Sequence, residues 1–342
     1  MSKKVNLIVT QDLRWRPSNN YSHPKIDFFR DGYAPPGGYI KDYGIIRKGD
    51  TFHLFHITGN PSQECNFPGN EIFFGHATTK DFETWTNHLP VMFIRPGTWE
   101  GGHVCDPQIM EHDGRYVMCY TGETNEIVQQ IGLAFSDDLF TWTRCEYNPI
   151  WNPLPAKWAQ WRNLPGASCR SPFIIKHGGE FHLIYLVYNK AGKGVLGRAV
   201  STDLIQWEDA GPVVENHEDI PEYEAATIYE RNGTWYLFSH LFRDCVLPNQ
   251  MNWVSSDRLD WFDVHQFSPI WDKNFVELKV VEKDKVADKW LVMGFFWDYA
   301  RPLGYPNSNP KNARVHLGIL DWTKDPITIT TVTKSSEVKP FL

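Results

Sequence analysis

Short apolar runs alternate with polar turns along most of the chain, and one pattern recurs. Each copy starts at an acidic or polar residue and continues with an apolar strand, a turn that usually contains glycine, and an aromatic-rich strand. Five copies occur, at residues 41–56, 105–120, 170–185, 224–239 and 277–294. Within them, Asp113-Gly114 and Asn232-Gly233 are strong signals for two-residue hairpin turns. The pattern predicts five hairpins that repeat at intervals of roughly 55 to 65 residues.

A second unit follows each of the first four hairpins. It combines a strand of small residues with Ser or Thr, then Asp, then Trp, and its copies lie at residues 75–86, 132–143, 197–208 and, more loosely, 253–264. The tryptophans of this unit recur at one fixed place; they are Trp85, Trp142, Trp207 and Trp261. A residue that every unit repeats is expected to pack between sheets, so we interpret them as structural rather than as sugar platforms.

Four short antiparallel strands per period describe the blade of a propeller, in which each unit buries its faces only against its neighbours. No stretch shows sustained helical periodicity. We therefore expect an all-β protein with a single five-bladed β-propeller over residues 36–325. Residues 1–35 are expected to pack on or close the ring, and residues 326–342 to form a C-terminal tail.

Composition narrows the possible partners. The 342 residues are 42% hydrophobic and carry a formal net charge of −7. An acidic balance without clusters of Lys or Arg argues against nucleic acid and anionic membranes as partners. Apolar runs reach about eight residues, whereas a membrane-spanning helix needs roughly 18 to 20. The start of the chain lacks a secretory apolar region, so we expect a cytoplasmic protein, although a removed signal peptide would leave the same sequence. The oligomeric state stays open.

The repeats differ where the innermost strand of each blade begins. Aligned on the aromatic residue after the turn, the first four copies place Asp42, Asp106, Ser171 and Ala225 at one position. The preceding position holds Lys41, Cys105, Arg170 and Glu224, and the fifth blade offers Glu277, although an insertion blurs its alignment. Because inner strands begin near the axis, these carboxylates and the arginine are expected to face one funnel.

Carboxylates that lie close together repel one another when ionised, which raises their pKa values. Because such a cluster destabilises the fold, we expect it to serve the function of the protein. A protonated and an ionised carboxyl group together suit glycoside hydrolysis. Two alternatives remain: Asp106 precedes Pro107 and can be a turn residue, and Glu277 can be a surface or rim residue.

Several of these segments resemble the motifs of a known protein family. Residues 36–325 resemble the five-bladed propellers of glycoside hydrolase family 32, and more distantly families 43 and 68. The segment at residues 169–179 resembles the Arg-Asp-Pro element of that family, and residues 223–238 resemble its Glu-Cys-Pro element. The resemblance implies that Asp42 is the nucleophile or base, that Glu224 is the general acid and that Arg170 binds substrate hydroxyls.

One departure from the family pattern concerns the Arg-Asp-Pro element. Its aspartate, which in the family holds sugar hydroxyls and supports the acid, is Ser171 here. Asp106, from the neighbouring blade, is a candidate replacement and is therefore included among the catalytic residues.

Further substrate-binding candidates line the same predicted mouth: Ser171, His103, His240, Trp297 and Asp298. Alternatively, the two histidines are loop or core residues that form hydrogen bonds within the protein, and Trp297 packs between blades. Trp99, Glu100 and Trp151 lie in loops that the repeat does not require, so we expect them at the rim. No phosphate-loop, nucleophile-elbow or zinc motif occurs, so we expect no cofactor and no catalytic metal, although the central channel can hold one calcium or sodium ion.

The sequence thus predicts a glycosidase that acts on a small oligosaccharide or glycoside. A furanoside is favoured, such as a fructofuranoside or an arabinofuranoside. Two alternatives stay open: a carbohydrate-binding propeller without catalysis, and a transglycosylase or phosphorylase on the same scaffold.

Overall fold

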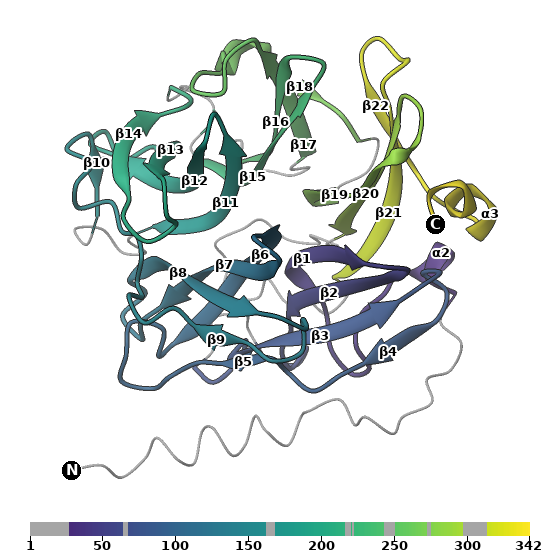
Figure 1. Ribbon diagram of the computed structural model, residues 1–342, viewed down its shortest axis with the longest axis horizontal. Helices are drawn as coiled ribbons and strands as arrows, with labels where there is room; N and C mark the ends of the chain where they lie inside the picture. Colours follow the sequence, from purple (N-terminus) through teal and green to yellow (C-terminus); the bar gives the residue numbers. More distant parts are fainter. Residues whose placement is uncertain are drawn as a thin grey trace.

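The computed structural model contains five antiparallel sheets, each built from one continuous segment and together arranged in a ring (Figure 1). It describes residues 27–63, 68–161, 168–215, 220, 222–242, 250–271, 275–296 and 313–342. This arrangement confirms the predicted all-β, five-bladed propeller.

The first three blades follow one another along the chain. Blade 1 contains β1 (Lys41–Lys48), β2 (Thr51–Ile57), β3 (Phe73–Thr79), β4 (Trp85–Asn87) and β5 (Met92–Phe93). Blade 2 contains β6 (His103–His112), β7 (Arg115–Glu123), β8 (Gln129–Ser136) and β9 (Thr143–Arg144). Blade 3 contains β10 (Ala159–Gln160), β11 (Cys169–His177), β12 (Glu180–Asn189), β13 (Gly194–Ser201) and β14 (Glu208–Pro212).

The last two blades and the short helices complete the described elements. Blade 4 contains β15 (Glu222–Arg231), β16 (Thr234–Phe242), β17 (Gln250–Ser256) and β18 (Ser268–Pro269). Blade 5 contains β19 (Phe275–Val286), β20 (Lys289–Phe296), β21 (Arg314–Asp321) and β22 (Thr328–Thr331). The helices are α2 (Phe28–Asp31), η2 (Val264–Gln266), α3 (Ser335–Val338) and η3 (Lys339–Phe341).

The repeated Ser/Thr-x-Asp sequence forms a local turn at the outer edge of the blades. In blade 1, the Thr79 hydroxyl accepts a hydrogen bond from the Phe82 amide at 2.8 Å, and the indole of Trp85 donates to the Phe82 carbonyl at 3.1 Å. Blades 2 and 3 repeat both contacts around Ser136 and Ser201. These local bonds explain why the motif recurs. Trp85, Trp142 and Trp207 also pack against the core clusters, as expected, whereas Trp261 is 37% exposed and the expectation of packing between sheets is wrong for it.

Buried apolar side chains fill the spaces between neighbouring sheets. Phe55 and Phe74 of blade 1, for example, share a cluster with Met118 and Tyr120 of blade 2, and all four are essentially inaccessible to solvent. Burying a large apolar side chain contributes about 1.5 to 3 kcal/mol relative to leaving it exposed. The blades are therefore held together by their faces, which keeps the inner strands in fixed relation to one another.

Blade 5 meets blade 1 through several contacts between distant parts of the chain. Tyr33 pairs with Val315, and Arg47 forms an ion pair with Glu282 at 2.8 Å. Arg47 also donates to the carbonyl of Leu342 at 2.5 Å, so the C-terminal residues cover this junction. The short helix α2 lies at the same junction (Figure 1).

The fifth blade extends farther than the sequence pattern predicts. Strand β22 pairs with β21, although its residues lie in the segment expected to be a tail after residue 325. Its sequence, Thr-Ile-Thr-Thr, lacks the tryptophan signature of the other outer strands, and its place is set by backbone hydrogen bonds to β21.

Candidate active site

The five inner strands share one irregularity, at the position that the sequence alignment singled out. The pairing register shifts there in every blade, and the residue at the shift has a positive φ. These residues are Asp42 (φ 40°), Asp106 (53°), Ser171 (54°), Ala225 (50°) and Glu277 (60°). A positive φ is uncommon outside glycine, and a bulge re-aims the side chain of its strand. The alignment predicted for the first four blades is therefore correct, and the structure places Glu277 at the equivalent position of the fifth blade.

Asp42 lies among other charged groups at the start of β1. Burial raises the pKa of Asp42 well above its usual range, the charge of Lys41 opposes this shift, and the charges of Asp106, Glu277 and Glu71 add to it. The Lys41 ammonium lies 3.2 Å from a carboxylate oxygen of Glu71. Three blades thus contribute charges that act on Asp42.

Asp106 connects the second blade to the third. Its Oδ2 accepts hydrogen bonds from the Thr121 hydroxyl at 2.7 Å and from the Ser171 backbone amide at 2.9 Å. The Ser171 hydroxyl is buried and has no hydrogen-bond partner among the described residues. The carboxylate of Asp106 therefore reaches the start of the third inner strand and holds the backbone of Ser171.

Arg170 connects the third blade to the fourth. Its Nε donates to Oε1 of Glu224 at 3.0 Å, and its Nη2 contacts the carboxylates of both Glu224 and Glu222. The charge of Asp106 also acts on Arg170. The charge of Asp106 acts on both Asp42 and Arg170, and Arg170 forms an ion pair with Glu224, so electrostatic interactions relate residues of four blades.

Glu277 completes the ring of funnel residues. It is only 4% exposed, pairs with Lys279 at 3.0 Å and accepts from the Tyr43 amide at 3.2 Å. Burial raises the pKa of Glu277, and the neighbouring Lys279 opposes the shift. The alternative that Glu277 is a surface or rim residue is wrong, because the bulge in β19 turns it inward.

Two of the further substrate-binding candidates, His103 and His240, lie among the described residues. His103 is partly exposed on β6, and His240 is buried on β16, opposite Glu224. Burial lowers the pKa of His240 to about 3, so its imidazole is neutral over most of the pH range. Trp297 and Asp298 lie outside the described residues.

Two of the expected rim residues are structural. Trp151 is 3% exposed and Glu100 is inaccessible to solvent. Glu100 pairs with Arg95 at 2.6 Å and with Arg144 at 2.7 Å, and it accepts from the Tyr120 hydroxyl at 2.8 Å. The expectation of a rim position is wrong for both: the carboxylate of Glu100 is buried with these partners, and Trp151 forms a backbone bridge with Ile131 of β8.

Several residues of the site escaped the sequence reasoning: Glu71, Thr121, Tyr188, Glu222 and Lys279. Glu222 carried a signal, since it lies two positions before Glu224 and shares its face of the strand. The others are placed by contacts between strands, which no local pattern indicates.

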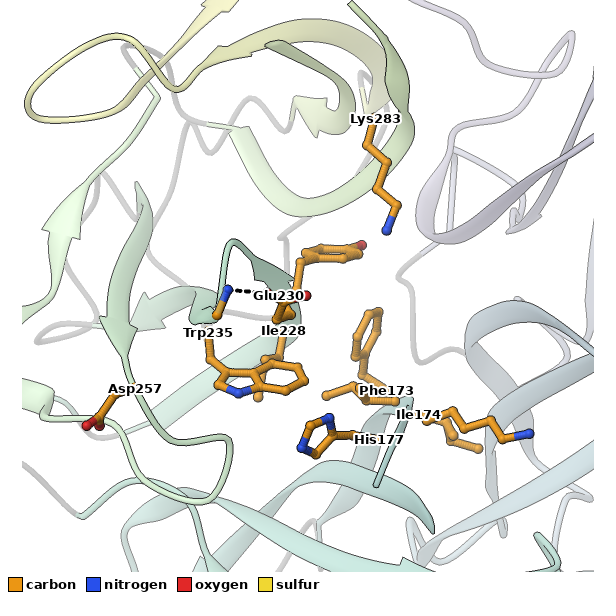
Figure 2. Close-up of a pocket in the computed structure, with 12 residues that line it drawn as sticks. Phe173, Ile174, His177, Ile228, Glu230, Trp235, Asp257 and Lys283 are labelled. Carbon is orange, nitrogen blue, oxygen red and sulfur yellow. Dashed lines mark hydrogen bonds between the residues drawn. The ribbon is translucent and has the colours of Figure 1, made fainter. Parts of the chain in front are cut away.

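A cavity of about 710 Å³ lies farther along β11 and β15 (Figure 2). Phe173, His177 and Trp235 line it, and Lys283 of β19 approaches from the opposite side. Glu230 of this cavity follows Glu224 by six positions on one strand, which corresponds to roughly 20 Å. None of the predicted site residues lines the cavity.

Metal ligands and membrane spans are the remaining features of the described part of the chain. It contains no group of three or more His, Cys, Asp or Glu side chains placed to hold a metal ion. None of its helices has the length and apolar character needed to cross a membrane. The expected lack of a catalytic metal and the possible channel ion stay predictions.

Comparison with known proteins finds sequence similarity in the first part of the chain. Residues 33–164 match the family model "Glycosyl hydrolases family 32 N-terminal domain". An acid β-fructofuranosidase from Vicia faba is 34% identical over 154 residues, which is 42% of this chain and 21% of the relative. The match thus spans about a fifth of that relative.

Solved structures share the fold over nearly the whole chain. The GH32 β-fructofuranosidase BmSUC1 of Bombyx mori has a TM-score of 0.69 at 17% identity, covering 95% of this chain and 68% of that one, and a variant of it is in complex with sucrose. A thermostable family-43 glycoside hydrolase has a TM-score of 0.63 at 13% identity, covering 87% of this chain and 95% of the other. The predicted resemblance to this superfamily is confirmed.

Proposed function

We propose that this chain is a glycosidase that hydrolyses fructofuranosides. The observation that supports the proposal is that Asp42 and Glu224 lie at the start of the inner strands of separate blades, where the charge of Asp106 acts on Asp42 and on Arg170, and Arg170 pairs with Glu224. The match of residues 33–164 to family 32 and the fructofuranosidase names of relatives support the substrate class.

In the proposed reaction, the carboxyl groups of Glu224 and Asp42 have different roles. Glu224 donates its proton to the leaving oxygen as the glycosidic bond breaks, and ionised Asp42 stabilises the cationic sugar as nucleophile or as base for water. Arg170, Ser171 and Asp106 bind sugar hydroxyls. The separation of the two carboxyl groups decides between retention and inversion of the anomeric centre.

Phosphorolysis is disfavoured by the charges in the funnel. Its cations Lys41, Arg170 and Lys279 each pair with a carboxylate of the described residues. A phosphate would have to displace these partners and approach the remaining carboxylates. Water is therefore the favoured acceptor.

Activity on a substrate panel tests the proposal. We expect release of fructose from sucrose or short fructans, and little activity on nitrophenyl arabinofuranoside or β-1,3-linked galactobiose. Sugar release is measured by chromatography, with Asp42→Asn as the background control. Cleavage of only the arabinoside or the galactoside would assign another substrate, and binding without cleavage would favour a carbohydrate-binding propeller.

Lys41→Met is expected to move the acidic limb of the pH–rate profile to higher pH. Asp42 acts in its ionised form, so activity is present above its pKa and lost as the pH falls through it. Lys41 lowers the pKa of Asp42, and removing its charge therefore raises that pKa further. The pH dependence of kcat/KM measures the shift, and Lys41→Arg, which keeps the charge, should retain the wild-type limb. A Met variant with an unchanged limb would contradict the prediction.

A further inference from the structure

Glu222 and Glu224 project from the same face of β15, because they are two residues apart on a strand. Both contact one guanidinium: Arg170 donates to Oε1 of Glu224 at 3.0 Å and to Oε1 of Glu222 through a short contact of Nη2. The side chains of Glu222 and Glu224 are 15% and 28% exposed. Arg170 therefore bridges an inner carboxylate and a more accessible one.

The bonds of the two carboxylates differ in number. The second oxygen of Glu222 accepts from the Tyr188 hydroxyl at 2.5 Å. Arg170 is fixed further by a bond from Nη1 to the Ser168 hydroxyl at 2.7 Å. Among the described residues, Oε2 of Glu224 has no hydrogen-bond partner. Both carboxylate oxygens of Glu222 thus accept hydrogen bonds within the protein, whereas Glu224 keeps one oxygen available to a ligand.

We propose that Glu222 is a positioning residue that holds Arg170 and neutralises its charge, which leaves Glu224 able to exchange a proton with the substrate. The inference rests on the proposed function, in which Glu224 is the proton donor. A guanidinium beside a carboxyl group favours the ionised form, which is the opposite of what a donor requires. A second carboxylate on the same guanidinium removes much of that effect.

The charges on Arg170 agree with this assignment. Burial opposes its charged form, but the carboxylates of Glu222 and then Glu224 raise the pKa of Arg170 well above its usual range. The other titratable groups near Glu224 come from neighbouring strands. They are Tyr188 of β12, which is protonated because burial raises its pKa, and neutral His240 of β16, which pairs with Glu224 across the strands; the charge of Asp106 of β6 acts on Arg170 itself.

The pH–rate profile of Glu222→Gln provides the first test. This substitution keeps the shape but removes the charge, so Arg170 acts on Glu224 alone and the proton donor is lost at lower pH. We expect the alkaline limb of kcat/KM to move to lower pH and the rate at neutral pH to fall about tenfold. Glu222→Asp, which retains the charge, should recover much of the wild-type limb. Glu208→Gln, the same change at an exposed position of β14, should leave the limb in place.

A double-mutant cycle provides a test that does not depend on activity. The free energy of unfolding is measured for Arg170→Met, Glu222→Gln, Glu224→Gln and the two double variants that include Arg170→Met. We expect the coupling between Arg170 and Glu222 to exceed that between Arg170 and Glu224 by about tenfold in the folding equilibrium constant.

The two measurements separate the possible failures. A larger Glu224 coupling, or a Glu222→Gln variant with the wild-type alkaline limb, overturns the inference even in an active enzyme. A wild type that cleaves no glycoside but shows the larger Glu222 coupling overturns the proposed function and supports Glu222 as the residue that holds Arg170.

Discussion

Asp42→Asn is expected to lower kcat on the fructoside substrate by about 10² to 10⁴-fold, or more if Asp42 is a nucleophile, while the propeller stays folded. The amide keeps the shape of the side chain but can neither attack the sugar nor accept a proton. Removing the charge should not harm folding, because burial already penalises ionised Asp42 and raises its pKa. Steady-state kinetics and thermal unfolding measure the two effects.

Glu224→Gln is the companion variant and should show a loss of similar size. It removes the proton donor, so substrates with good leaving groups should retain more activity than sucrose does. Asp50→Asn is a matched control, since Asp50 is exposed in the turn at the far end of β1. Near wild-type activity in either site variant would show that the residue is wrongly assigned, whereas an unfolded variant would have to be replaced by Asp42→Ser or Glu224→Ala.

Asp106→Asn is expected to reduce kcat/KM by about 10- to 100-fold, and Ser171→Ala by less than about tenfold. A hydrogen bond to a charged group contributes about 1.5 to 3 kcal/mol, against about 0.5 to 1.5 kcal/mol for a neutral one. Asp106 also bonds the Ser171 amide and the Thr121 hydroxyl, so its loss disturbs the start of the third inner strand. Kinetics of the two single variants measure the ranking.

The pH profile of Asp106→Asn adds a second readout. From the sequence, Asp106 is expected to support the acid Glu224; in the structure its charge raises the pKa of Asp42. Its removal should lower that pKa and move the acidic limb to lower pH, opposite to the shift for Lys41→Met. A large loss of kcat/KM in Ser171→Ala, together with nearly wild-type kcat/KM in Asp106→Asn, would show that Asp106 is only a turn residue. This result would contradict its proposed replacement of the family aspartate.

The sequence by itself determined the number of blades and the register of the funnel. Both follow from local physics. The Ser/Thr-x-Asp-Leu-x-x-Trp turn closes through hydrogen bonds to residues two or three positions away, as at Ser136 and Asp138, so each copy forms its own turn. Since the copies adopt the same strand geometry, one position per repeat reaches the axis, and Asp42, Asp106, Ser171 and Ala225 could be aligned without coordinates.

Only the tertiary structure decided which groups meet inside the funnel. Arg170 lies 52 positions from Glu222 in the sequence, and Asp106 lies 65 from Ser171. Glu100, expected at the rim, is buried by its pairing with two arginines. These ion pairs form when neighbouring blades pack face to face, because a buried charge is strongly destabilising unless an opposite charge lies next to it. The pairing depends on distances between side chains of different blades, which a local repeat pattern does not contain.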